Sequence, residues 1–216
     1  MTKKTRKALM MVLCAVALVA ISVGATVAYL TSTDTVTNTF TVGKVAITLD
    51  EAKVDVDGKP VTPAERVKTN DYKLMPGHKY TKDPTVTVKA GSESCYVKMT
   101  VTFSKASELD AIFDPKGADM TSIFNGYDST KWIYKGNTEN TAANTRTYEF
   151  WYNEIVSGAA SADVPLDALF DSITVPGTIN NAQLDTIVGM TITVNAYAIQ
   201  ADGFGTADAA WTAYNN

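Results

Sequence analysis

Histidine is the side chain most often used for acid–base catalysis near neutral pH, and this chain of 216 residues contains only one, His78. A zinc protease helix of the H-E-x-x-H type needs two histidines, so that site is excluded. His78 lies in the segment MPGHK, residues 75–79, which is typical of a turn before a strand. We therefore predict an exposed turn histidine rather than the base of a Ser-His-Asp triad.

The two cysteines, Cys14 and Cys95, offer no better nucleophile. Cys95 alternates with Val97 and Met99, which places it on the apolar face of a predicted strand. A buried cysteine behaves as a small hydrophobic residue and keeps its proton. Cys14 lies in an N-terminal apolar segment that we expect to be removed, so no intrachain disulfide is predicted.

The acidic segment DVDG, residues 55–58, is similar to the start of a calcium-binding loop, but the KPV that follows supplies no further carboxylate at the required spacing. A two-residue turn at Asp57-Gly58, flanked by valines, is the better interpretation. A pair of carboxylates for sugar hydrolysis stays open, because their separation is a tertiary property. We expect no catalytic residue, no metal and no cofactor.

Aromatic side chains supply one more possible binding surface. Five of them in the second half of the chain could form a carbohydrate-binding platform: Trp132, Tyr134, Trp151, Trp211 and Tyr214. In a β-sandwich such residues more often fill the core and close its ends, which is the interpretation that we favour.

Charge argues against a nucleic-acid partner. The first 29 residues carry four of the 19 basic residues and none of the 23 acidic ones, so their removal leaves a net formal charge of −8. Phosphate backbones require a basic face, which this balance does not supply.

The N-terminus has the layout of a secretory signal. Four basic residues (Lys3, Lys4, Arg6 and Lys7) precede a run without charge at residues 8–30. The small-x-small pattern Thr26-Val27-Ala28 predicts cleavage between Ala28 and Tyr29, within a residue or two, and a signal peptide over 1–29. The alternative is a permanent anchor, because the uncharged run exceeds the ~20 residues that cross a bilayer.

Alternating apolar and polar residues dominate the rest of the chain. Strands are predicted at 85–89, 94–104, 147–152 and 188–198, the last with Val188, Met190, Ile192 and Val194 inward. Short helices are predicted at 107–113, 120–124 and 165–170, where Pro165 suits a first helical position. This order predicts an all-β fold with short helices on its connections, an antiparallel jelly-roll-like β-sandwich over 44–216.

The strand pattern that precedes this domain changes phase at Gly43. Phe40 and Val42 follow one period of two, whereas Val45, Ile47 and Leu49 follow another that is displaced by one residue. A β-bulge at the glycine is one explanation, since glycine suits a bulge. The other is a boundary between two segments that serve different cores.

Three stretches of the chain resemble a known family. ATVAYL at 25–30, NTFTVGKV at 38–45 and LMPGHKYTKD at 74–83 resemble the export signal, the mature start and the L-x-P-G turn of the TasA/camelysin family of biofilm matrix proteins. The resemblance is most specific over residues 24–103. It implies a jelly-roll sandwich, processing by a SipW-type signal peptidase, and assembly into extracellular fibres in which the N-terminal segment of one subunit supplies a strand to the next.

On this resemblance, our first hypothesis is that the chain is a secreted, non-enzymatic subunit that polymerises with itself. An accessory protein is a possible anchor for the polymer. The membrane would be involved only for the precursor. Residues 30–43 would be the donor strand, with Leu30, Val36, Phe40 and Val42 inserted and Gly43 as the hinge. Two alternatives stay open: a secreted peptidase like that described for the camelysin branch, although the histidines of a familiar zinc site are lacking, and a module that binds cell-wall glycan.

Overall fold

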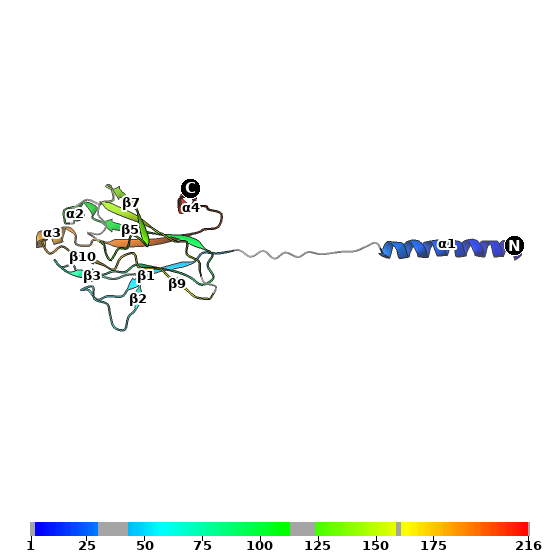
Figure 1. Cartoon of the computed structure of the whole chain (residues 1–216), viewed down its shortest axis with the longest axis horizontal. Coiled ribbons are helices and arrows are strands. Elements are labelled where there is room, and N and C mark those ends of the chain that lie inside the picture. The colour runs from blue at the N-terminus through cyan, green and yellow to red at the C-terminus, as the bar shows by residue number, and fades with distance from the viewer. Residues whose placement is uncertain (1–2, 30–42, 113–123, 159–160, 216) are drawn as a thin grey trace. The chain divides into compact units, whose positions relative to one another are not determined.

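The computed structural model describes residues 3–29, 43–112, 124–158 and 161–215. The chain divides into two compact units, Met1–Val42 and Gly43–Asn216. In the first unit, α1 spans Lys3–Tyr29. Within the described part of the chain, no helix reaches the length and apolarity required to cross a bilayer. The second unit holds all of the described strands and is called the sandwich unit below (Figure 1).

Every described strand pair in the sandwich unit is antiparallel, and the described strands form three sheets (Figure 1). The first has the order β2-β1-β4-β9, with β2 at Arg66–Val67, β1 at Ile47–Ala52, β4 at Thr85–Val88 and β9 at Val164–Pro165. The second has the order β3-β10-β6, at Lys79–Thr81, Ser172–Thr174 and Phe124–Asn125. The third has the order β11-β5-β8-β7, at Ile192–Gln200, Cys95–Ser104, Thr145–Tyr152 and Trp132–Asn140.

In the described part of the sandwich unit, short helices connect or cover these sheets: α2 at Ala106–Asp110, α3 at Asn181–Thr186 and α4 at Ala207–Tyr214. The predicted all-β sandwich with short helices is therefore confirmed. The finer prediction of jelly-roll connectivity stays a prediction.

The core forms where the apolar faces of the three sheets meet. From β5 it receives Cys95, Val97, Met99, Val101 and Phe103, the face that the alternation predicted. Val86 and Val88 of β4 and Phe124 of β6 join them and are at most 1% exposed. Each such side chain contributes about 1.5–3 kcal/mol when it is fully buried, so the core is the main source of stability.

Aromatic rings fill the middle of this core. Phe124 stacks on Phe170 at 4.3 Å between ring centroids and meets Tyr148 and Phe150 edge to face. Edge-to-face and offset-stacked geometries are the favourable ones for such pairs.

α4 packs on the outer face of the third sheet through Trp211, which is 2% exposed. Beneath it lies the buried ammonium of Lys98, 4.7 Å from the Trp211 ring and 5.6 Å from the rings of Tyr197 and Tyr214. Glu149 lies 3.5 Å from the same nitrogen. The aromatic faces and the carboxylate together stabilise a cation that burial alone would disfavour.

Two local predictions were wrong or displaced, and a third lies almost wholly outside the described residues. Pro165 does not start a helix: it lies in β9, an edge strand where a missing N–H is tolerated, and residues 166–170 are not helical. The strand predicted from Val188 begins at Ile192, because α3 and a turn occupy the preceding residues, and Val188 is 67% exposed. The helix predicted at 120–124 lies outside the described residues except for Phe124, which belongs to β6.

Candidate functional site

The predicted polymerisation residues Leu30, Val36, Phe40 and Val42 lie outside the described residues. Ala28 and Tyr29, at the predicted cleavage site, are the last two residues of α1. Their roles therefore stay predictions.

Gly43 is the first residue of the sandwich unit and lies ahead of the β1 ladder. A Cβ atom at this position would lie 2.7 Å from Cγ of Glu93, so the two segments approach closely here. Beyond it, Val45, Ile47 and Leu49 all pack against the main core, as their common phase predicts. The β1–β4 pairing runs from Ile47 onward without a shift of register.

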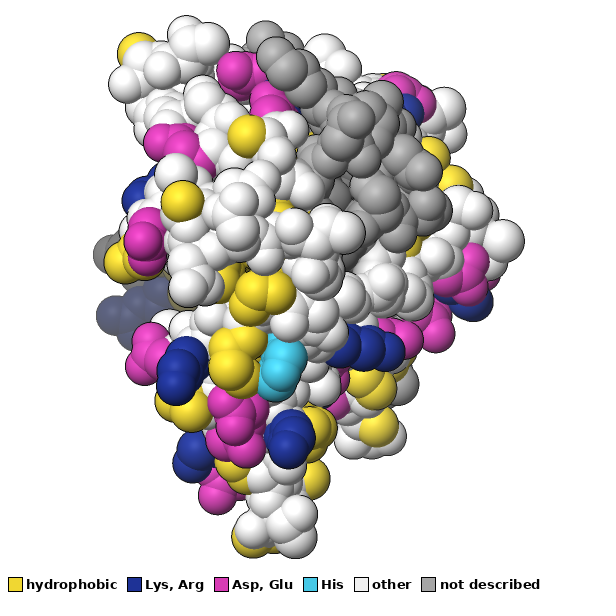
Figure 2. All heavy atoms as spheres, turned by 90° about the vertical axis from the view of Figure 1, so that its left-hand side faces the viewer, with side chains coloured by type: hydrophobic (Ala, Val, Ile, Leu, Met, Phe, Trp, Pro, Cys, Tyr) yellow, Lys and Arg dark blue, Asp and Glu magenta, His cyan; other side chains and the backbone are white. Residues whose placement is uncertain are grey.

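The two candidate catalytic side chains, His78 and Cys95, differ in exposure. His78 is exposed in its turn, at the surface drawn in Figure 2. Its backbone N–H donates to the Met75 carbonyl at 3.2 Å. Cys95 is fully buried, and burial raises the pKa of its thiol to about 11, so the nucleophilic thiolate is disfavoured. On the face drawn in Figure 2, acidic and basic side chains are interspersed rather than gathered by sign.

The segment at 55–58 forms a turn, as predicted. The Asp55 carboxylate accepts N–H groups from Asp57 and Lys59, at 3.0 and 2.9 Å, so it caps its own loop. The flanking pairing is a single bridge between Val54 and Pro60 rather than a hairpin ladder. Among the described residues, no group of three or more His, Cys, Asp or Glu side chains is arranged to hold a metal ion.

The aromatic residues considered for glycan binding do not form one exposed platform. Trp132 and Trp211 are at most 2% exposed, and Tyr134 and Trp151 are only partly accessible. Tyr214, at 48%, is the exposed member of the set. The favoured interpretation, that these rings fill and close the sandwich, agrees with this burial.

One side of the sandwich has an open edge, which we call the β1/β11 edge. All nine residues of β11 pair with β5, and no described backbone hydrogen bond of this strand goes to any other strand. Residues 47–50 of β1 likewise pair only with β4, because β2 reaches no further than Glu51 and Ala52. The two strands lie next to each other. A row of unpaired backbone groups is a template for another strand.

The side chains along this edge are apolar and incompletely covered. β11 turns Ile192, Val194, Ala196 and Ala198 toward the main core, and β1 does the same with Ile47 and Leu49. All of them are only partly buried, whereas the equivalent positions of β5 are at most 5% exposed. The core is therefore less complete at the β1/β11 edge than in its middle.

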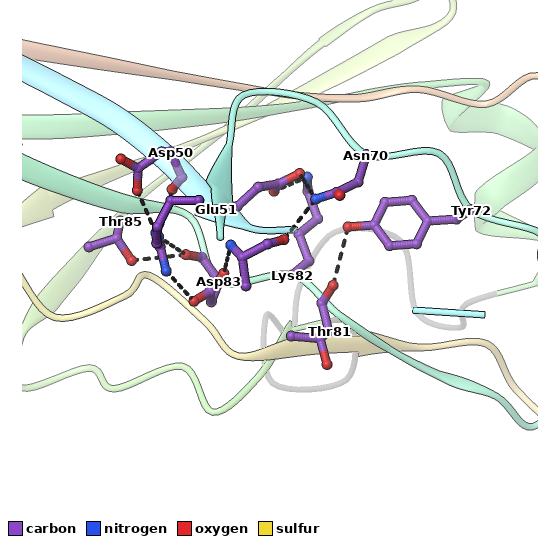
Figure 3. Close-up of polar contacts among 10 residues, drawn as sticks. Asp50, Glu51, Asn70, Tyr72, Thr81, Lys82, Asp83 and Thr85 are labelled. Atoms are coloured by element: carbon purple, nitrogen blue, oxygen red, sulfur yellow. Dashed lines mark hydrogen bonds and ion pairs between the residues drawn. The ribbon is translucent and has the colours of Figure 1, made fainter. Parts of the chain in front are cut away.

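A buried polar cluster lies at the other end of β1 (Figure 3). We call it the Glu51 cluster and define it as Glu51, Lys82 and Asn70. Glu51 Oε2 accepts a hydrogen bond from Lys82 Nζ at 2.6 Å, and Oε1 accepts one from Asn70 Nδ2 at 2.9 Å. The side chains of Lys82 and Glu51 are only 9% and 8% exposed.

Two neighbours shape the surroundings of this cluster. Arg66 donates to Asp50 at 2.6 Å and to Asp83 at 2.7 Å, and the Asp83 carboxylate also accepts the Ala52 N–H at 2.6 Å. These contacts join β1, β2 and the start of β4. Burial and the nearby Glu51 carboxylate raise the pKa of the Tyr72 hydroxyl above its usual range, so it stays protonated and donates to the Thr81 carbonyl at 3.2 Å (Figure 3).

Our reading of the sequence missed the Glu51 cluster, although a signal was present. Glu51 continues the inward phase of Ile47 and Leu49, and Lys82 continues the even-numbered phase of Tyr80 and Val86. A charged residue at an inward strand position must find a partner, because an unpaired buried charge is strongly disfavoured. Asn70 gave no such signal, because it follows the two-residue strand β2.

No family model, no curated protein and no solved structure matches this chain.

Proposed function

We propose that the chain is a secreted structural subunit that polymerises into extracellular fibres by donor-strand exchange. The resemblance to the TasA/camelysin family, with its jelly-roll topology and SipW-type processing, motivates this proposal. The single observation that supports it most is the β1/β11 edge, where backbone groups have no strand partner among the described residues and apolar side chains are half-buried.

The edge suits an incoming strand for two reasons. A strand added beside β11 gains main-chain hydrogen bonds along nine residues, and its alternate side chains reach the incompletely covered core. Ala196 and Ala198 are the smallest of the inward residues of β11, so they are the positions beside which we expect a large side chain such as Phe40 to insert. Each inserted Val, Leu or Phe would contribute about 1.5–3 kcal/mol.

The geometry of the exchange explains a fibre. A segment that precedes the sandwich unit and binds the edge of another copy makes a head-to-tail contact, which does not close on itself. The phase change at Gly43 then has a simple meaning: Phe40 and Val42 serve the core of a neighbour, and Val45, Ile47 and Leu49 serve their own.

Electron microscopy of the purified chain from residue 30, beside a chain truncated to residues 44–216, tests the proposal. We expect fibres from the first and folded monomers from the second. Fibres that persist without residues 30–43 would refute donor-strand exchange, because the donor would then be absent.

A peptide of residues 30–43, added to the truncated chain, isolates the contact itself. We expect binding, and we expect Val42→Asp in the peptide to weaken it at least ~30-fold, since about 2 kcal/mol of apolar burial is lost and a charge is buried. Thr41→Asp is the matched control, because Thr41 lies on the opposite face of the donor. Equal losses from both substitutions would show that the predicted phase of insertion is wrong.

A further inference from the structure

The Glu51 cluster has the three groups needed for an amide-forming reaction: an amine, a carboxamide and a carboxylate between them. They come from separate segments, since Glu51 lies in β1, Asn70 follows β2 and Lys82 follows β3. Figure 3 shows the Lys82 and Asn70 side chains converging on the Glu51 carboxylate, one on each oxygen. Nucleophile and electrophile are thereby held on the same carboxylate, which fixes their positions as a reaction between them requires.

Burial prepares the amine for attack. With side chains that are 9% and 8% exposed, Lys82 and Glu51 are largely removed from water, which disfavours charged forms. Transfer of one proton across the 2.6 Å hydrogen bond converts the ion pair into a neutral amine and a neutral acid. A neutral lysine amine in an apolar pocket is an activated nucleophile. The Tyr72 ring, with its centroid 6.0 Å from Lys82 Nζ, covers this nitrogen.

The carboxamide is also oriented and polarised. Asn70 Oδ1 accepts the Val54 N–H at 3.0 Å, so a fixed donor faces the oxygen on which negative charge would develop. Asn70 Nδ2 donates to Glu51 Oε1 and to the Ala52 carbonyl, each at 2.9 Å. The nitrogen that would leave is thus placed beside the group that can protonate it.

We propose that Lys82 and Asn70 join in an intramolecular isopeptide bond, with Glu51 as the proton-transfer group. Nζ of Lys82 attacks Cγ of Asn70, the Nζ–Cγ bond forms, and the Cγ–Nδ2 bond breaks with its electron pair leaving on nitrogen. Of the three protons on the Lys82 ammonium, one stays on the new amide, one passes by way of Glu51 to the leaving nitrogen, and one remains on Glu51. Ammonia departs, and no oxidant or reductant is needed.

The products account for the buried charges. The ion pair becomes a neutral amide and a neutral carboxylic acid, so the desolvation that disfavours a buried ion pair is removed. The new bond would tie the segment after β2 to the segment after β3. Both segments contact β1, the first described strand of the sandwich unit, through Glu51 near its C-terminal end, so the bond would hold that end of β1 in place.

Mass spectrometry of the purified, denatured full-length chain tests this inference. We expect a mass below that of the sequence by one ammonia. Trypsin should then yield a branched peptide that joins residues 69–73 to 80–89, with no cleavage after Lys82. An unmodified mass for folded wild-type protein would overturn the proposal. Loss of ammonia without the branched peptide would also overturn it, because cyclisation at Asn125-Gly126 gives the same mass change.

Two variants assign the roles. Glu51→Gln keeps the shape of the side chain but removes the base, so we expect the branched peptide to disappear. Lys89→Met is the matched control: it removes a lysine that pairs with Asp163 at the surface, and the branched peptide should persist, with its second arm extended to residues 80–98 because the tryptic site at 89 is lost. A branched peptide that forms equally well in Glu51→Gln would show that Glu51 has no part in the reaction. If Glu51→Gln does not fold, the wild-type peptide map still decides whether the bond exists.

Discussion

The isopeptide bond should stabilise the sandwich unit by an amount set by loop closure. A link between residues 70 and 82 closes a loop of about 13 residues, which in the chain-entropy model contributes about 3 kcal/mol. For a domain of this size, that corresponds to a Tm difference of about 6–12 °C. Glu51→Gln should lower Tm by at least this much, because it also leaves the Lys82 ammonium without its carboxylate.

The double variant Glu51→Gln/Lys82→Met separates the two effects. Both buried charges are then absent, so the stability that is still missing relative to wild type measures the link. Denaturant titration provides a second readout: a linked unfolded chain is more compact and exposes less surface, so wild type should have a smaller m-value than the double variant.

Equal m-values, together with a Tm difference of only a degree or two, would contradict the presence of the link. That result would mean that the Glu51 cluster is an ordinary buried ion pair with a hydrogen-bonded amide. A variant elsewhere in the unit, such as Arg146→Met, should lower stability without changing the m-value, which makes it the control for a native-state effect.

Three further predictions concern contacts that are independent of the link. Arg146→Met should lower the free energy of unfolding by about 3–5 kcal/mol, because Arg146 and Asp110 form a bidentate pair whose side chains are only 7% and 12% exposed. Denaturant titrations of the double variant with Asp110→Asn should show that most of this lost stability is restored. Trp211→Ala should lower the free energy of unfolding by about 3–5 kcal/mol, because it opens a cavity over Lys98. Tyr214→Ala should lower it less, because Tyr214 is half exposed. An equal effect of the two substitutions would contradict the packing of α4. Burial raises the folded-state pKa of Cys95 to about 11 from an ordinary 9.0, so the neutral thiol is favoured in the folded state. The neutral thiol therefore contributes about 2–3 kcal/mol to the free energy of unfolding below pH 9, and this contribution should be lost as pH rises from about 9 to 11. Urea titrations across that range should show a smaller loss for Cys95→Ala, and identical pH dependence would contradict the burial of the thiol.

Local periodicity was enough to predict the faces of the longer strands. Alternation placed Cys95, Val97 and Met99 on one face and correctly implied that the thiol is buried. The pleat of a strand imposes this period of two wherever the strand lies, so no tertiary information is needed. Pro165 shows where local rules fail: a proline that suits the first turn of a helix equally suits an edge strand, and its pairing with Thr87 decides between them.

Local sequence patterns therefore predicted an all-β domain after an N-terminal apolar segment, the inward faces of its main strands, and a change of phase at Gly43. The tertiary structure adds that, among the described residues, β11 and the first part of β1 each pair along one side, and that Asn70 and Lys82 meet on the carboxylate of Glu51. The face of the sheet on which a side chain lies is set by its neighbours one and two residues away, so it can be predicted from local sequence. Edges and buried clusters depend instead on which distant segments pair and in what register.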